Sequence, residues 1–496
     1  MLGCEGRRKV WAVPENAFLR DLFYFESRDR LERMRLLTRE MVTLVGEEVE
    51  LTGWVSARRD HGKIIFIDLR DRGGVAQVVF TPKEKELYEA GSRLRPEWVV
   101  KIRGKISVRP KGMENEAIPT GKHELVATHL EVISEAETPP FPLDTDGHEI
   151  DEEVRLKYRY LDLRRERLHR NIKLRSEFVN RIRQFLFKRD FTEIETPMLT
   201  KSTPEGSRDF VVPSRLHPGK FFALPQSPQQ YKQLLMVAGF ERYFQIARCV
   251  RDEDLRADRG FEHSQIDLEM SFVKREEVMA MDEEMITSVV EGMGYTLKEK
   301  PFPVIPYTEA IAKYKGDKFD LRTEADKKNN VLAFAWVVDF PFFEKDPAAP
   351  SGWAFTHNPF SMPKEEHVEW LKKGERIGEI LTTQYDLVCN GYEVGGGSIR
   401  AHQPEILKSV FRILGYEDDV IEAQFGHMLT AFKYGAPPHG GIAHGVERLL
   451  MILTGEQYLR EVQAFPQTSS GRTSVMDAPA ALDPKQLKEL KLKVKK

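Results

Sequence analysis

The sequence predicts an α+β protein in which a small β-barrel is joined by a hinge to a larger mixed domain. Three observations predict this arrangement. Short runs of β-branched and apolar residues, separated by Gly, Pro and charged turns, fill residues 48–134. The proline-rich segment ETPPFPLD follows at residues 137–144. Beyond it, strand-like and helical runs alternate up to about residue 480, too irregularly for repeated βαβ units.

Composition places the chain among folded, non-membrane proteins. It has 496 residues, a hydrophobic fraction of 41% and a formal net charge of −3, which argues against a disordered chain. No run reaches the roughly 18 apolar residues of a membrane span, and the start of the chain lacks the pattern of a secretory signal. The three cysteines lie far apart, which argues against disulfides or a cysteine zinc site and predicts a cytoplasmic protein.

Each domain boundary follows from a change in pattern. Residues 1–35 are an N-terminal extension whose order the sequence leaves open. Residues 36–136 predict a Greek-key barrel of the OB type, because five short strands and one helix-like interval are too few for a typical sandwich. Residues 137–170 are the linker and hinge, since clustered prolines cannot continue a strand ladder. Residues 171–482 form the mixed domain, and residues 483–496 are a basic C-terminal tail.

Charged residues lie on predicted strands of the mixed domain. The runs VRDEDLRADR and QIDLEM are the clearest cases. Because alternate residues of a strand face one side, Arg251 and Glu253 point the same way, as do Gln265, Asp267 and Glu269. A cation beside carboxylates on one sheet face suits a charged ligand together with magnesium. A salt-bridged surface sheet is the alternative interpretation.

Two further clusters contain small residues. In CNGYEVGGGSIR, consecutive glycines between Glu393 and Arg400 let a ligand or another backbone approach closely. In PPHGGIAHGVERLLM, Arg448 lies near the start of an amphipathic helix and can reach an anion there. The alternatives are a bulge or turn for the first cluster and a helix cap for the second. The sequence has no P-loop, dinucleotide-binding, HExxH or GxSxG motif.

In this order, the motifs resemble those of the class II aminoacyl-tRNA synthetases, most closely the bacterial-type aspartyl-tRNA synthetases. The resemblance covers about residues 37–480 and rests on TPEGSRDFVVPSR, ALPQSPQQYKQLLMVAGFERYFQIARCVRDEDLRADR, QIDLEMSFV, NGYEVGGGSIR, PPHGGIAHGVERLLM and, for an anticodon-binding OB domain, GWVSARRDHGKIIFIDLRDR. It implies a class II catalytic domain, an antiparallel sheet with flanking helices. It also implies an enzyme that activates L-aspartate with ATP and Mg²⁺ and transfers it to the terminal ribose of tRNA(Asp). No tightly bound organic cofactor is expected.

The resemblance implies ATP-binding roles for Arg251, Glu253, Gln265, Glu393 and Arg448. Arg251 would hold the α-phosphate and Arg448 the γ-phosphate, and these two with Glu253 form the expected catalytic set. Glu253 and Glu393 would carry the adenine contact and the magnesium ligation, with Glu393 the expected metal ligand. The adenine ring would lie against one of two aromatic residues, Phe261 or His263.

The resemblance implies aspartate binding by Glu205, Gln229, Lys232, Asp267, His357 and Arg400. Arg400 would pair bidentately with the substrate β-carboxylate, and Lys232 would add a second positive charge. Glu205, Gln229 and Asp267 would take the α-ammonium group. Asparagine would leave two cations without a partner, so we expect selection of aspartate.

In the predicted barrel, the resemblance implies that Phe66 stacks on an anticodon base while Arg59, Gln77 and Glu124 read base edges. A core phenylalanine is the alternative interpretation of Phe66. His61 occupies a loop position at which relatives with histidine often charge both tRNA(Asp) and tRNA(Asn). It therefore favours tRNA(Asn) as a second substrate without settling the question.

Three features depart from the pattern of the family, and a fourth concerns assembly of the protein. YKGDKFDLR is followed within a dozen residues by LAFAWVVDFPFFE, so the large domain that bacterial relatives insert here is absent. THNPF has Asn358 where the family has a second histidine after His357. His444 replaces a usual aromatic residue, which suggests simple variation of the pocket wall. The helix ending FLFKRDF and the strand TEIETPML resemble the family's dimer motif and predict a twofold homodimer.

Three other functions stay open. One is a paralogue that makes a free amino-acid amide, against which the full barrel weighs. Another is a nucleic-acid-binding module without catalysis, against which the retained charged residues weigh. The third is an asparaginyl or lysyl synthetase, and the pair Lys232 and Arg400 favours an acidic substrate over either.

Overall fold

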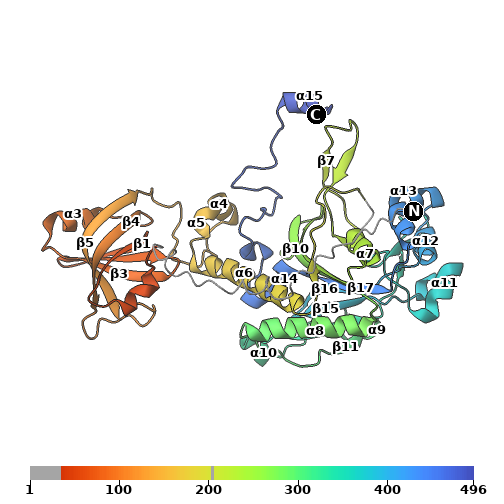
Figure 1. Cartoon of the computed structure of the whole chain (residues 1–496), viewed down its shortest axis with the longest axis horizontal. Coiled ribbons are helices and arrows are strands. Elements are labelled where there is room, and N and C mark those ends of the chain that lie inside the picture. The colour runs from red at the N-terminus through yellow and green to blue at the C-terminus, as the bar shows by residue number, and fades with distance from the viewer. Residues whose placement is uncertain (1–34, 203–205, 496) are drawn as a thin grey trace, which may run out of the picture. The chain divides into compact units, whose positions relative to one another are not determined.

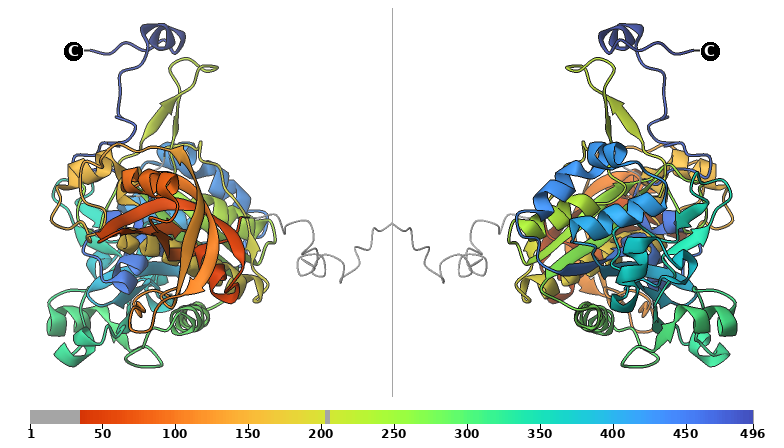
Figure 2. Two further views of the ribbon diagram at one scale, coloured as in Figure 1. Left: turned by 90° about the vertical axis from the view of Figure 1, so that its left-hand side faces the viewer. Right: turned by 90° about the vertical axis from the view of Figure 1, so that its right-hand side faces the viewer.

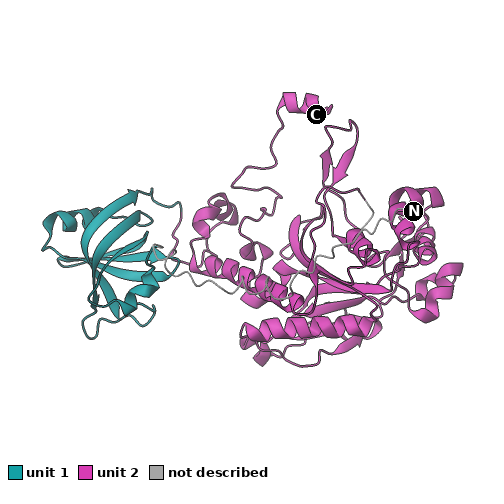
Figure 3. Ribbon diagram, in the orientation of Figure 1, with its two compact units in different colours: residues 1–140 teal, residues 141–496 magenta. Residues whose placement is uncertain are grey.

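The computed structural model describes residues 35–202 and 206–495. The chain divides into two compact units, residues 1–140 and 141–496 (Figure 3). All but the last residue of the expected N-terminal extension therefore lies outside the described residues. Within the described ranges, no helix has both the length and the apolar character that a membrane crossing requires.

The first unit contains the predicted OB-type barrel. Its five strands close in the order β1-β2-β3-β5-β4, with β3 and β5 parallel and the other pairs antiparallel. A helix links β3 to β4, and a short 3₁₀ helix precedes β1. The bounds are η1 (Thr38–Thr43), β1 (Glu48–His61), β2 (Ile64–Asp71), β3 (Gly74–Phe80), α3 (Lys85–Arg93), β4 (Val99–Val108) and β5 (His123–Ser134).

Aliphatic side chains at every second strand position fill this barrel. On β2, Ile65, Ile67 and Leu69 are buried in the barrel core, while the intervening Phe66 is only partly buried. Successive side chains of a strand point to opposite faces, so aliphatic residues pack inside and the alternate set faces outward. A Cβ atom at Gly104 would lie 2.3 Å from a carbonyl oxygen of β5, so this close approach of two strands needs glycine.

The second unit is built on an eight-stranded sheet in the order β11-β12-β15-β16-β17-β10-β9-β6. The two edge pairs, β11 with β12 and β6 with β9, are parallel, and the pairs between them are antiparallel. The predicted antiparallel sheet is confirmed. Its strands are β6 (Thr192–Glu193), β9 (Arg242–Val250), β10 (Glu262–Ser271), β11 (Val304–Pro306), β12 (Phe334–Val338), β15 (Tyr385–Cys389), β16 (Tyr392–Ile399) and β17 (His439–Gly445).

Helices cover both faces of this sheet (Figure 1). Ile266, Leu268 and Met270 of β10 pack in one core with α6 (Glu166–Phe187), α8 (Arg275–Gly292) and α14 (Val446–Thr454). The alternate residues of β10 face the other side, where α7 (Gln229–Val237) lies. Behind α7, a second apolar cluster unites α11 (Val368–Lys373), α12 (Pro404–Ile413) and α13 (Asp418–Phe432). The sheet face opposite α8 carries polar side chains of β10, among them Asp267 and Glu269, which contact Lys232 of α7.

Shorter elements complete the unit. The hairpin of β7 and β8 projects from its body (Figures 1 and 2). The connection from α9 to β12 runs through the short α10. The remaining bounds are α4 (Glu152–Lys157), α5 (Arg159–Asp162), β7 (Val211–Pro213), β8 (Phe221–Ala223), α9 (Tyr307–Tyr314), α10 (Glu324–Lys328), β13 (Phe343–Lys345), β14 (Trp353–Phe355), η2 (Glu365–His367), η3 (Ile377–Glu379), η4 (Leu459–Val462) and α15 (Pro484–Glu489).

A buried ion network fixes the start of this unit. Arg159 Nη1 and Arg165 Nε each lie 2.7 Å from a carboxylate oxygen of Asp162. Arg155 Nη2 lies 2.9 Å from Glu461 Oε1 in η4. Burial opposes ionisation of Glu461, but the neighbouring arginines hold its pKa at about 2. Residues inside the predicted hinge are thus tied to η4, whose first residue lines the cavity described next.

Candidate active site

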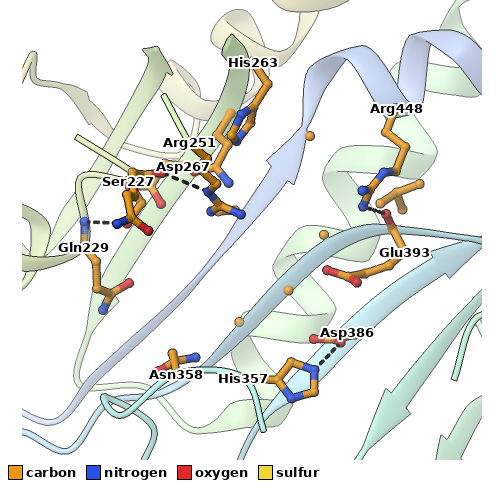
Figure 4. Close-up of a pocket in the computed structure, with 18 of the residues that line it drawn as sticks. Ser227, Gln229, Arg251, His263, Asp267, His357, Asn358, Asp386, Glu393 and Arg448 are labelled. Atoms are coloured by element: carbon orange, nitrogen blue, oxygen red, sulfur yellow. Dashed lines mark hydrogen bonds and ion pairs between the residues drawn. The ribbon is translucent and has the colours of Figure 1, made fainter. Parts of the chain in front are cut away.

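A cavity of about 350 Å³ opens on the sheet face opposite α8 (Figure 4). Strands β10, β16 and β17 form its floor, and α7 and the start of α14 supply side chains at its edges. The structure brings ten of the residues predicted from the sequence to this cavity: Gln229, Lys232, Arg251, Glu253, Gln265, Asp267, His357, Glu393, Arg400 and Arg448.

Four buried charges form a cluster at one side of the cavity. Lys232 Nζ lies 2.6 Å from Asp267 Oδ1 and 3.2 Å from Glu269 Oε2. Arg400 Nε lies 2.9 Å from Glu269 Oε1, and Arg400 Nη2 lies 3.1 Å from Glu269 Oε2. None of the four residues is more than 3% exposed. Two cations and two carboxylates offset each other's charge, as buried ions require.

Sequence reasoning placed Glu269 on the same strand face as Asp267 but gave it no role. In the structure it orients both cations, because it contacts Lys232 and Arg400 at once. Burial opposes its ionisation, yet Arg400 and Lys232 hold the pKa of Glu269 at about 2. Glu269 is therefore a carboxylate at neutral pH. The period-two pattern of QIDLEM was the signal that could have identified it.

Asp267 retains one unused acceptor. Its Oδ2 is buried and has no hydrogen-bond partner among the described residues. Burial raises the pKa of Asp267, and the neighbouring Lys232 opposes that rise. Buried acceptors are nearly always paired in folded proteins. A ligand with an ammonium group in the cavity would supply the missing donors.

Two arginines, Arg251 and Arg448, also line the cavity. Arg251 Nε donates to the carbonyl of Gln226 at 3.4 Å. Arg448 Nη1 donates to the carbonyl of Glu393 at 2.6 Å. Burial, then the charges of Arg251 and Arg448, lower the pKa of His263 to about 3. His263 is therefore a neutral imidazole at neutral pH, and the positive field of the two arginines suits a polyanion such as a nucleotide phosphate chain.

Two carboxylates lie on the neighbouring strands β15 and β16. Glu393 Oε2 is 3.0 Å from Lys318 Nζ. Burial opposes ionisation of Glu393, but Lys318 and Arg448 lower its pKa below the ordinary value. Asp386 Oδ2 is 3.1 Å from His357 Nε2, and Asp386 also lines the cavity. Two hard oxygen ligands beside a polyanion site match the ligand preference of Mg²⁺, so these residues fit that ion.

Sequence reasoning missed Asp386. Burial raises its pKa, although the contact with His357 opposes the rise. The same contact raises the pKa of His357 despite burial of the ring. Asp386 follows Tyr385 on a strand of otherwise apolar residues, and a lone acidic residue in such a strand was the available signal. His357, predicted to bind aspartate, thus lies beside the carboxylate pair.

Four further predicted residues have different outcomes. Glu205 lies outside the described residues. Of the two candidates for the adenine contact, His263 lines the cavity, whereas the ring of Phe261 packs edge-on against Phe210 at 5.2 Å. The interpretation of His444 as a variable pocket-wall residue is wrong. Its side chain is fully buried on the helix side of the sheet and contacts α8.

In the first unit, the predicted anticodon residues share the outer face of neighbouring strands. Cross-strand pairs place Arg59 opposite Phe66 and Gln77 opposite Glu124. Gln77 Nε2 donates to Glu124 Oε2 at 2.8 Å, and the rings of His61 and Phe66 lie 6.2 Å apart. Phe66 is not a core residue, so the alternative interpretation of it is wrong. A partly exposed aromatic ring among polar side chains is suited to stacking on a base.

Two family models match the chain. The model described as tRNA synthetases class II (D, K and N) matches residues 151–469, and the model described as OB-fold nucleic acid binding domain matches residues 49–133. An aspartate–tRNA(Asp/Asn) ligase of Rubrobacter xylanophilus is 40% identical, and the alignment covers 90% of this chain and 94% of that protein. The enzyme of the same name from Syntrophomonas wolfei is 38% identical over 94% of this chain and its whole length.

The alignment with the Rubrobacter protein spans 571 positions, more than the 496 residues of this chain. That relative therefore carries segments that this chain lacks, in keeping with the missing insertion.

Solved structures agree on the fold. A putative aspartyl-tRNA synthetase of Leishmania major superposes with a TM-score of 0.72 at 21% identity, covering 89% of this chain and 95% of that one. An asparaginyl-tRNA synthetase of Pyrococcus horikoshii, complexed with asparaginyl-adenylate, gives 0.68 at 23% identity, covering 91% and 100%. Family model, relatives and fold agree with the cavity and its charged residues, and the chain belongs to the class II tRNA synthetases of the D, K and N group.

Proposed function

We propose that the chain is an aspartate–tRNA ligase. It activates L-aspartate with ATP, forming aspartyl-adenylate and pyrophosphate, and then transfers the aspartyl group to the 3′-terminal ribose of tRNA(Asp). The observation that carries this proposal is the buried cluster of Lys232, Asp267, Glu269 and Arg400 beside a cavity that two arginines also line. The names of the relatives support the same activity.

The cluster supports recognition of a small diacid. Arg400 is held by Glu269 in a bidentate contact, which fixes the plane of its guanidinium before a ligand arrives. Lys232 lies beside it and provides a second positive charge for a β-carboxylate. Asp267 offers its unused oxygen to the α-ammonium group. Asparagine would place a neutral amide before the two cations, so its transition state is stabilised less.

The two arginines support the first chemical step. In that step an oxygen of the substrate α-carboxylate forms a bond to the α-phosphorus, and the bond from that phosphorus to the pyrophosphate oxygen breaks. Arg251 would hold the α-phosphate and Arg448 the γ-phosphate, which orients the reactants and offsets the developing charge. Glu393 and Asp386 would hold Mg²⁺, which would supply positive charge to offset that of the phosphate groups. Glu253, paired with Arg259 at 3.3 Å, and Gln265 are left to the adenosine part of ATP.

In the second step a ribose hydroxyl of the tRNA attacks the activated carbonyl carbon, and AMP leaves. The barrel would select the tRNA. Phe66 would stack on an anticodon base, and Arg59, Gln77 and Glu124 would contact base edges. His61 lies exposed at the end of β1, next to Phe66. We include tRNA(Asn) as a second substrate because His61 occupies this position and the named relatives act on both tRNAs.

We also propose a homodimer in the cytoplasm. Apolar side chains of the dimer-motif segment are exposed: Phe187 at 53%, Met198 at 42% and Leu199 at 51%. A second copy would cover them around a twofold axis. Sedimentation is expected to give twice the chain mass at micromolar concentration, and a monomer would contradict the dimer.

One assay tests the proposed function. With ATP and Mg²⁺, aspartate is expected to drive pyrophosphate exchange, and asparagine is expected to be about 10⁴-fold less effective in kcat/KM, because the cations reject a neutral amide. Purified tRNA(Asp) and tRNA(Asn) are both expected to become aspartylated. Exchange driven equally by asparagine would contradict the amino-acid assignment. Absence of product on tRNA(Asn) alone would remove only that second substrate.

A further inference from the structure

His444 occupies the side of the sheet that the cavity does not use. Its neighbours Ala443 and Gly445 line the cavity, and by strand alternation the His444 side chain lies on the other face. There its Nε2 lies 2.6 Å from Asp282 Oδ1 of α8. Both residues are fully buried. Asp282 Oδ2 has no hydrogen-bond partner in the described part of the chain, so the carboxyl group depends on His444, which contacts its other oxygen.

The other nitrogen of the ring reaches a β-bulge. Strands β15 and β16 pair in one register up to Leu387 opposite Gly395, and the next pair is Val388 opposite Glu393. Val394 is therefore the extra residue of a bulge, a feature that re-aims neighbouring side chains. His444 Nδ1 lies 3.2 Å from the carbonyl oxygen of Val394.

The bulge sets the position of two proposed ATP-side residues. Glu393 precedes Val394, and its carboxylate lines the cavity. The carbonyl of Glu393 accepts from Arg448 Nη1 at 2.6 Å. A shift of the Val394 peptide would therefore move a proposed metal ligand and a proposed phosphate ligand together. The cluster of Lys232, Asp267 and Arg400 has no part in these contacts.

The ring must present a hydrogen to the bulge. A carbonyl oxygen only accepts, so a contact between it and Nδ1 needs the proton on Nδ1. The proton of the short contact with Asp282 can then lie on either partner, and Nδ1 keeps its own hydrogen in both cases. The ring packs closely against the backbone of Gly395. A Cβ atom at that position would lie only 2.3 Å from His444 Nδ1.

We propose that His444, oriented by Asp282, is a positioning residue that holds the Val394 bulge and thereby aims Glu393 and Arg448 at the nucleotide. The inference rests on the proposed function, since it concerns the ATP-binding side of the same cavity. It assigns the pair to ATP binding alone, and not to recognition of the amino acid.

The test uses a double variant, His444→Phe with Asp282→Leu, in the full chain. Replacing His444 alone would leave a buried carboxyl group without its partner, so the fold could fail for an unrelated reason. The double variant removes both polar groups and keeps an apolar filling. Calorimetry with a nonhydrolysable ATP analogue and Mg²⁺ is expected to show about tenfold weaker binding, as for loss of an outer-shell partner. The KM for aspartate in pyrophosphate exchange is expected to stay within about twofold, because its ligands are untouched.

Asp282→Asn is the matched control. Its amide can donate to Nε2, which keeps the proton on Nδ1 and the contact with Val394. We expect it to bind the ATP analogue as wild type does. The inference would be overturned if the double variant bound the ATP analogue as wild type does. It would also be overturned if binding of the ATP analogue and of aspartate weakened equally, or if Tm fell by a large amount, because either result would indicate a purely structural pair. Absence of aspartate-driven exchange in the wild type would count against the proposed function, whereas analogue binding would still test the inference.

Discussion

Arg400→Leu is expected to lose about 10²- to 10³-fold in kcat/KM for aspartate, because truncating one partner of a buried charge pair costs about 2–5 kcal/mol. Its affinity for ATP is expected to stay within about twofold of wild type, because Arg251 and Arg448 are held by other groups. Aspartate-driven pyrophosphate exchange and calorimetry with a nonhydrolysable ATP analogue measure the two effects separately.

The same substitution affects the fold, because Arg400 also neutralises Glu269. Without it, Glu269 keeps one ion-pair partner among the described residues, Lys232 at 3.2 Å. We therefore expect a loss of about 3–5 kcal/mol in the free energy of unfolding. The pH dependence of the free energy of unfolding shows whether this ion pair stabilises the fold. Arg400 and Lys232 hold the pKa of the buried Glu269 at about 2, below its ordinary 4.5. In the wild type, the stability from this shift is present above pH 4.5 and is lost as the pH falls toward 2. The free energy of unfolding of the Arg400→Leu variant should fall less over the same pH range.

A double variant separates recognition from charge balance. Arg400→Leu with Glu269→Gln removes the carboxylate that the single variant leaves under-compensated, so the free energy of unfolding should largely recover. Aspartate activation should stay lost, because Arg400, the proposed partner of the substrate β-carboxylate, is still absent. If the double variant instead recovers activation, Arg400 serves only to neutralise Glu269, and the assignment of the amino-acid pocket is wrong.

The features that local pattern determines were predictable from the sequence. The barrel follows from five closely spaced strands, and the polar face of β10 follows from the period of two in QIDLEM. Resemblance supplied the roles of Arg251, Glu393 and Arg448, and the cavity brings these side chains together.

What could not be predicted depends on strand order. Strand β16 lies between β15 and β17, and β17 lies beside β10, although their sequence positions differ by up to about 180 residues. Only this order places Asp386 beside Glu393 and Arg400 against Glu269. His444 was misplaced for a related reason. GGIAHG has too little contrast between polar and apolar residues to show which side chains face the helices, and the contact with Asp282 is long-range.

Glu393→Gln is expected to slow aspartyl-adenylate formation by about 10²-fold at a fixed Mg²⁺ concentration, because a preorganised charged group beside the reacting phosphates is lost. A neutral amide is a weaker ligand for a hard cation than a carboxylate, so a higher Mg²⁺ concentration should restore part of the rate. The KM for aspartate should be unchanged. Equilibrium binding of Mn²⁺ to the variant with the ATP analogue, followed by electron paramagnetic resonance, gives a readout that does not depend on turnover.

Glu253→Gln is the matched control for this assignment. Glu253 lines the same cavity and carries the same charge, but its carboxylate pairs with Arg259 at 3.3 Å. Glu393 instead lies on the strand next to that of Asp386, the second oxygen ligand that we propose. A divalent cation takes several oxygen ligands, so only the Glu393 variant should require more Mg²⁺. If Glu253→Gln shows the greater requirement, the metal lies on the other side of the cavity, and Glu393 makes the adenine contact instead.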